Sequence, residues 1–176
     1  MKQYIIDAEF TLSVPPRLVC IGIKEVGKKE LVHVIDHRDC CDFNKLEQLK
    51  EFFSTPALFI GHHIQQDIAV LEWNGIKFHP DSKFYDTGLA IRNINENETR
   101  WDLKSWATYL GISPYWYYFE DNVESPGVAN MDLKELVIYN AWDLKTNEVL
   151  YKWCLNHIKQ EHVFQLSYFF GFHLPK

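Results

Sequence analysis

The stretch Tyr4-Ile5-Ile6-Asp7-Ala8-Glu9, an apolar run that ends in two acidic residues, decides the fold of this chain. Its tyrosine and isoleucines favour a β-strand. Residues two apart along a strand point to the same face, so Asp7 and Glu9 are expected to project together. The alternative is an edge strand whose two carboxylates are simply solvated.

Three further residues come from distant parts of the chain. Asp67 follows Phe59-Ile60-Gly61-His62-His63, which is typical of a strand end that runs into a helix. Tyr139 and Asp143 are four apart in a strongly helical stretch and would share one helical face. Taken alone, Asp67 is also explained as an acid favoured by a helix N-terminus, Asp143 as a surface residue and Tyr139 as a packing residue.

Together, the four acidic residues predict a metal site. Carboxylates gathered from separate segments repel each other unless a cation lies between them, and hard divalent cations prefer oxygen ligands. Mg²⁺ or Mn²⁺ is therefore the expected occupant. Two such ions, about 3.5–4 Å apart, hydrolyse phosphodiesters, and a site for them needs several carboxylates, which Asp7, Glu9, Asp67 and Asp143 supply. Tyr139 would orient the attacking water rather than take its proton, because its reference pKa is about 10.

Alternating apolar strands and helices predict an α/β fold with a mixed sheet of about five strands covered by helices. Strands are predicted at 3–10, 18–26, 30–37, 57–61 and 83–86. Helices are predicted at 44–53, capped by Asp42 or Asn44, at 65–73, from a cap at Asp86 or Thr87 to 91, at 102–110 and at about 131–160. A turn at Gly27-Lys28-Lys29 predicts that the second and third strands form a hairpin. Residues 113–130 stay unassigned, and 1–176 is expected to be one domain.

The composition is globular with an acidic balance. Of the 176 residues, 47% are hydrophobic and 24% are charged, and the formal net charge is −6. Such a protein is not a general nucleic-acid coat protein, but ions in an acidic site can still receive a phosphate. Binding to a long duplex by counterion release should be weak. This fits an enzyme that holds a few nucleotides or is delivered to its substrate by a partner.

The cysteines and the apolar segments indicate an intracellular, cytoplasmic location. Cys20, Cys40, Cys41 and Cys154 lack C-x-x-C spacing, so a zinc site is not expected and the adjacent pair is expected to be free thiols. The chain shows no signal-peptide pattern, and no apolar stretch approaches about 18 residues. We therefore expect no contact with a membrane.

Three motifs in this order resemble those of the 3′–5′ exonucleases of the DEDD superfamily. The first is Asp7-Ala8-Glu9, the second is Gly61-His62-His63-Ile64-Gln65-Gln66-Asp67 and the third is Tyr139-Asn140-Ala141-Trp142-Asp143. Tyr85-Asp86-Thr87 and Leu103-Lys104-Ser105-Trp106-Ala107 support the match, which runs from about residue 3 to 155. Ile138 stands where the histidine variant of the family has its histidine, so the tyrosine (DEDDy) subclass is indicated.

The resemblance implies a ribonuclease H-like sheet and a metal-dependent 3′–5′ exonuclease, as in the proofreading domains of family A DNA polymerases. Such an enzyme releases nucleoside 5′-monophosphates from single-stranded or frayed DNA 3′ ends with two Mg²⁺ or Mn²⁺ ions. Asp7 would bridge both ions, Glu9 and Asp143 would hold the ion that carries the nucleophile, and Asp67 would support the other. A DNA polymerase or replication partner and a viral origin are open expectations.

The resemblance also implies which residues touch the substrate. Thr11 and Leu12 would border the 3′ nucleotide, with Tyr139 beside them, and His63 would contact the substrate or merely pack. Three positions depart from the family pattern: Leu12 is often glycine, His63 is usually asparagine and Gln66 is commonly aromatic. Two alternatives stay open: an RNA 3′–5′ exonuclease similar to ribonuclease D, and a catalytically silent nucleic-acid-binding domain of the same fold.

Two aromatic segments carry open alternatives. The cluster at 115–119 would stack on the bases of a frayed strand or form the buried side of a lid. The segment 164–172 would pack on the domain or form an exposed patch that docks onto a partner.

Overall fold

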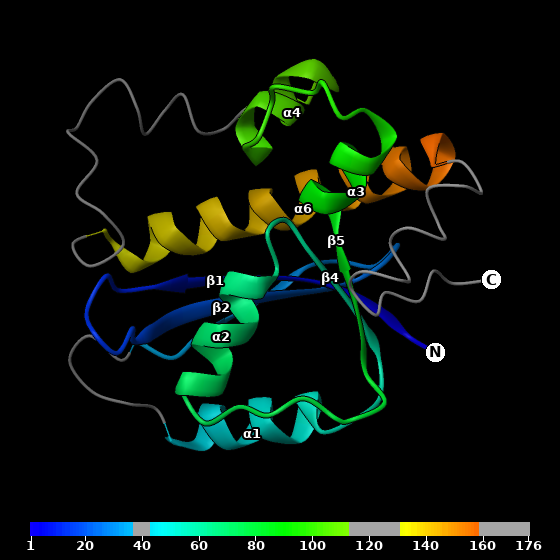
Figure 1. Ribbon diagram of the computed structural model, residues 1–176. Helices are drawn as coiled ribbons and strands as arrows, with labels where there is room; N and C mark the ends of the chain where they lie inside the picture. Colours follow the sequence, from blue (N-terminus) through cyan, green and yellow to red (C-terminus); the bar gives the residue numbers. More distant parts are fainter. Residues whose placement is uncertain (37–42, 113–130, 159–176) are drawn as a thin grey trace.

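The computed structural model describes residues 1–36, 43–112 and 131–158 (Figure 1). The expectations for Cys40 and Cys41, for the cluster at 115–119 and for the segment 164–172 lie outside these residues.

A five-stranded mixed sheet forms the centre of the molecule, as predicted. Its strands are β1 (Gln3–Phe10), β2 (Leu18–Glu25), β3 (Leu31–Val34), β4 (Leu58–Gly61) and β5 (Lys83–Asp86). They lie in the order β3-β2-β1-β4-β5, with β1 antiparallel to β2 and parallel to β4. The predicted hairpin of β2 and β3 is confirmed, and Gly27 takes the positive φ of 79° that its turn requires. Because β1 is central, the edge-strand explanation for Asp7 and Glu9 is wrong.

Helices cover both faces of the sheet, so the fold has three layers (Figure 1). They are α1 (Phe43–Phe53), α2 (Gln65–Trp73), α3 (Thr87–Ile94), α4 (Leu103–Tyr109) and α6 (Leu133–His157). On one face, Ile6 and Ala8 of β1 pack with α1 and α2. On the other, Ile5 packs with α3, α4 and α6. Alternation along β1 then assigns Asp7 and Glu9 to the face of Ile5, under α6.

The predicted element boundaries hold to within a few residues. α3 continues to Ile94, beyond the predicted end at 91, and Asn95 still donates its N–H to the carbonyl of Ile91. α1 begins at Phe43, so Asn44 lies inside the helix and the prediction that it caps the helix is wrong. α6 is capped by Asp132, whose carboxylate accepts the N–H groups of Lys134 and Glu135.

Within the three described segments, every helix falls short of the length and apolarity that crossing a bilayer requires.

Candidate active site

Three carboxylates converge between β1 and α6. One ligand oxygen from each of Asp7, Glu9 and Asp143 lies within 4.8 Å of the others. Asp7 and Glu9 share a strand face, and Asp143 lies on the buried side of α6. The β1–β2 register shifts between Glu9 and Phe10, and such a bulge re-aims the side chains beside it.

Asp67 joins this group from the first turn of α2. Its Oδ1 accepts a hydrogen bond of 2.8 Å from the backbone N–H of Ala8, the residue between Asp7 and Glu9. Burial of its side chain, and then repulsion from the Asp7 carboxylate, raises the pKa of Asp67. The second motif is therefore tied to the first by a direct bond, although Asp67 lies outside the tight group of three.

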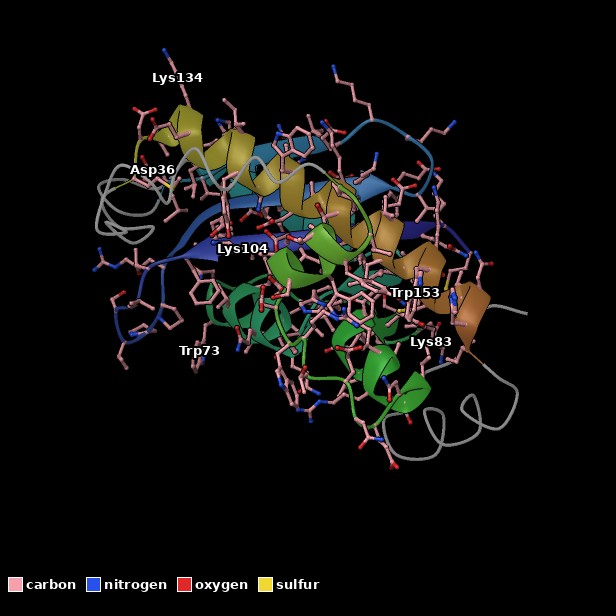
Figure 2. All side chains as sticks on the ribbon, turned by 90° about the horizontal axis from the view of Figure 1, so that it is seen from above. Asp36, Trp73, Lys83, Lys104, Lys134 and Trp153 are labelled. Atoms are coloured by element: carbon pink, nitrogen blue, oxygen red, sulfur yellow. The ribbon has the colours of Figure 1, made fainter. Side chains whose placement is uncertain are left out.

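Tyr139 lies one helical turn before Asp143, and its hydroxyl donates a hydrogen bond to the Asp143 carboxylate. Burial and the neighbouring carboxylates raise the pKa of Tyr139 further, so the phenol keeps its proton at neutral pH. Lys104 of α4, labelled in Figure 2, places its Nζ 5.9 Å from the centre of the Tyr139 ring. The phenol is therefore suited to donate a hydrogen bond and unsuited to act as a general base.

The pKa values of the buried carboxylates indicate that a cation would stabilise their ionised forms. Burial raises the pKa of Asp7 to about 7. Burial, together with repulsion from Asp7 and Asp143, raises the pKa of Glu9 well above its usual value. The pKa of Asp67 is also raised well above its usual value, and burial is the largest cause. Oxygen donors crowded at this distance and short of positive charge match the ligand preference of Mg²⁺ and Mn²⁺, so the residues fit the predicted ions.

The chain after β4 borders the same edge of the sheet. The two ring nitrogens of His62 lie 3.0 Å from Oγ1 of Thr87 and 2.8 Å from the carbonyl oxygen of Trp101. His63 reaches the same carbonyl at 3.0 Å, and its φ of 58° turns the backbone there. Its backbone N–H donates to Asp86 at 3.2 Å. Burial lowers the pKa of His62, which favours a neutral ring.

Asp86 caps a helix, as one of its two candidate caps was predicted to do. Its Oδ1 accepts the N–H groups of Gly88 and Leu89 at the start of α3. It also lies close enough to Asp67 for repulsion to raise the pKa of that carboxyl. Thr87, the other predicted cap, is the first residue of α3 and bonds instead to Asn147 of α6 at 2.9 Å.

Thr11 and Leu12 stand where the chain leaves β1. Oγ1 of Thr11 accepts the N–H of Arg17 at 3.0 Å and lies 2.6 Å from the Ser13 hydroxyl, so it closes the base of the β1–β2 loop. The Leu12 side chain is 93% exposed. Of the two, Leu12 is the residue with surface available to a substrate.

Sequence reasoning missed a row of buried polar residues along α6. Its members are Asn140, Thr146, Asn147 and Glu148, in addition to the predicted Asp143. Apolar periodicity predicts a helix without marking its buried polar positions, and two apolar residues of this helix, Val149 and Leu155, are exposed. Gly22 is a signal that could have found Asn140, because a lone glycine inside an apolar strand indicates a close approach. A Cβ at Gly22 would lie 2.0 Å from Oδ1 of Asn140.

Comparison with known proteins extends these observations. No model of a protein family and no curated protein sequence matches the chain. Solved structures do. NrnC of Brucella melitensis with bound Mg²⁺ is 17% identical with a TM-score of 0.67, over 94% of this chain and 78% of that one. The same protein bound to pGG is 19% identical with a TM-score of 0.65, over 90% and 74%.

Two other solved structures match most of this chain, and the match spans a smaller part of each of those proteins. Escherichia coli RNase D, an exoribonuclease, is 18% identical with a TM-score of 0.60, over 88% of this chain and 39% of that one. The POL domain of Pol1 from M. smegmatis, in complex with DNA primer-template and dNTP, is 11% identical with a TM-score of 0.63, over 94% and 25%. The protein therefore has the ribonuclease H-like fold of the DEDD 3′–5′ exonucleases, the superfamily that its three motifs resemble.

Proposed function

We propose that the protein is a metal-dependent 3′–5′ exonuclease that removes nucleoside 5′-monophosphates from single-stranded or frayed DNA 3′ ends. One observation carries the proposal: on a fold shared with nucleases, the oxygens of Asp7, Glu9 and Asp143 lie within 4.8 Å of one another. Asp67 accepts a hydrogen bond from the backbone N–H of Ala8, which lies between Asp7 and Glu9. The four acidic residues come from three motifs and lie beside one strand. The end of a strand has no structural need for so many carboxylates.

Each residue has a distinct part in the proposed reaction. Asp7, Glu9 and Asp143 hold Mg²⁺ or Mn²⁺, with Asp67 supporting the second ion. When bound, two ions lower the pKa of the attacking water and stabilise the charge that develops during in-line displacement. Tyr139, which keeps its proton, holds Asp143 and orients the water by hydrogen bonding.

The proposed substrate contacts lie around this centre. Leu12 presents an exposed apolar side chain at the end of β1 for the 3′-terminal base, above the Thr11 that closes the loop. His63 stands at the end of β4 with an exposed side chain beside the same edge. A single 3′ end fits contacts of this kind, since a few residues can hold only one or two nucleotides.

An RNA 3′–5′ exonuclease is the second candidate. It is supported by the likeness to RNase D and by NrnC, whose structure was solved with pGG. The likeness to Pol1, bound to DNA, supports the DNA candidate and a role beside a polymerase. Recognition of a 2′-hydroxyl separates the two substrates, because this group is what distinguishes RNA from DNA at a site.

The test uses labelled single-stranded DNA and RNA of one sequence, each blocked in turn at the 5′ or the 3′ end, and the dinucleotide pGG. Each is incubated with Mg²⁺, Mn²⁺ or a chelator. The proposal expects mononucleotides from DNA with a free 3′ end, only with a metal, and none from the 3′-blocked strand. Faster release from RNA would select the second candidate. Cleavage in chelator, or from a blocked 3′ end, would contradict both.

The silent-domain alternative is separated by calorimetric titration with Mn²⁺. An enzyme of this kind is expected to bind up to two ions, and a silent domain is expected to bind little. The variant Asp7→Asn with Glu9→Gln is the matched control, because it keeps the size of both side chains and removes their charge.

A further inference from the structure

We propose that Asn140 is a positioning residue that fixes the carboxylate of Asp7 for metal binding, and that Gly22 keeps open the space Asn140 needs. The proposal deepens the proposed function and rests on it. It concerns two residues outside the four predicted metal ligands, one on α6 and one on β2.

The amide of Asn140 holds Asp7 at two points. Its Nδ2 donates to the backbone carbonyl of Asp7 at 3.0 Å and to the carboxylate Oδ2 of the same residue at 2.6 Å. Because both acceptors belong to one residue, the pair of bonds restricts rotation about the Cα–Cβ bond of Asp7. Asn140 has no exposed surface, so water does not compete for the donor. Oδ1 of Asp7 is left for a cation.

The same amide also reaches Glu9: burial raises the pKa of that carboxyl, and a hydrogen bond with Asn140 acts against the rise. Oδ1 of Asn140 is buried and has no hydrogen-bond partner among the residues that the structure describes. It faces Gly22, where an added Cβ would clash both with this oxygen and with the side chain of Leu144. Gly22 is the register partner of Asp7 across the β1–β2 pair. The missing side chain on β2 therefore leaves a space beside Asp7 that the amide of Asn140 and the side chain of Leu144 fill.

An uncharged donor suits this position. A lysine or arginine would neutralise Asp7 and compete with a divalent cation, and another carboxylate would add repulsion. An amide orients the oxygen and leaves the negative charge available. Groups that orient metal ligands in this way typically change metal affinity by about 10–100-fold when they are removed.

The test is calorimetric titration of the full chain with Mn²⁺. Asn140→Ala is expected to weaken Mn²⁺ binding by about 10–100-fold. It should raise the metal concentration for half-maximal exonuclease rate by a similar factor, with the KM for the oligonucleotide little changed. Gly22→Ala, whose added Cβ displaces the amide and also presses on Leu144, is expected to weaken Mn²⁺ binding in the same direction. In the background of Asn140→Ala, Gly22→Ala should weaken Mn²⁺ binding less than it does in the unmodified protein, because only its contact with Leu144 remains.

Thr146→Ala is the matched control. Thr146 lies on the same helix and is equally buried, and within the described part of the chain its hydroxyl has no hydrogen-bond partner. Its replacement should leave Mn²⁺ affinity unchanged. Equal weakening by Thr146→Ala, or normal affinity in both Asn140→Ala and Gly22→Ala, would overturn the positioning role. If Asn140→Ala fails to fold, Gly22→Ala alone decides. If the unmodified protein binds no Mn²⁺, the positioning role and the proposed function both fail. If it binds Mn²⁺ and the two variants bind it equally well, only the positioning role fails.

Discussion

The backbone N–H of Ala8 donates a hydrogen bond to Oδ1 of Asp67 across 59 residues of sequence. Through this bond the second acidic motif is attached to the middle of the first. Asp67 is thus both a proposed metal ligand and a structural link between α2 and β1. The two roles differ in what they require, because the link needs an acceptor oxygen and the metal site needs a negative charge.

Replacing Asp67 in two ways separates these roles. Asp67→Asn keeps an acceptor for Ala8, so its free energy of unfolding should stay close to that of the unmodified protein while exonuclease activity falls sharply. Asp67→Ala leaves the buried N–H of Ala8 without a partner, which costs about 1–3 kcal/mol. Denaturant unfolding and a nuclease assay check both. Equal stability of the two variants would show that the bond contributes little.

Neutralising Asp7 and Glu9 should abolish activity and stabilise the metal-free fold. Asp7→Asn with Glu9→Gln removes charges that would hold the metal ions, and bound ions would lower the pKa of the attacking water, so a loss of roughly a thousandfold or more is expected. Repulsion within the buried group is relieved at the same time, so the thermal midpoint in chelator at pH 8 should rise. Retention of a tenth of the activity would refute the assignment of these residues.

Tyr139→Phe tests orientation against proton transfer. The phenol keeps its proton because burial and neighbouring carboxylates raise its pKa. Loss of one hydrogen bond of about 1.4 kcal/mol would slow turnover roughly tenfold, far less than loss of a carboxylate. The slope of the rate against pH should not change. A complete loss of turnover would instead give the tyrosine an obligatory role in proton transfer.

Sequence patterns predicted the elements well because their signals were local. Alternation along β1 placed Asp7 and Glu9 on one face, and the run at 58–61 was short and apolar as a buried strand should be. The helix ends were less accurate, since backbone bonds extend α3 past the predicted residue. The central position of β1 follows from long-range pairing, which no local pattern encodes.

The contacts inside the site depended on tertiary packing. The bond between Asp67 and Ala8 and the two bonds between Asn140 and Asp7 each join residues far apart in sequence. Residue type does suggest that Asp67 could bind metal, but it does not suggest that its partner is a backbone N–H. Asn140 lies within the third motif, but the sequence does not predict its role, because an asparagine inside a helix has no single preferred partner.

The pH dependence of the metal-free protein follows from the raised pKa values. Asp7 has a pKa of about 7 in the folded protein and an ordinary value of 3.8, so the folded state favours its protonated form. A raised carboxyl pKa stabilises the fold at low pH, and this contribution is lost as the pH rises toward and through about 7. Glu9 and Asp67 shift in the same direction.

In chelator, raising the pH from 5 to 8 should therefore lower the thermal midpoint of the unmodified protein more than that of the variant Asp7→Asn with Glu9→Gln. This comparison is needed because His33 and His62, whose pKa values are lowered, act in the opposite sense below about pH 6.5. Added Mg²⁺ should raise the midpoint more at pH 8 than at pH 5, because only ionised carboxylates bind it. If the two proteins follow the same pH curve, with or without Mg²⁺, then Asp7 and Glu9 carry no buried charge, and the metal site they are proposed to form does not exist.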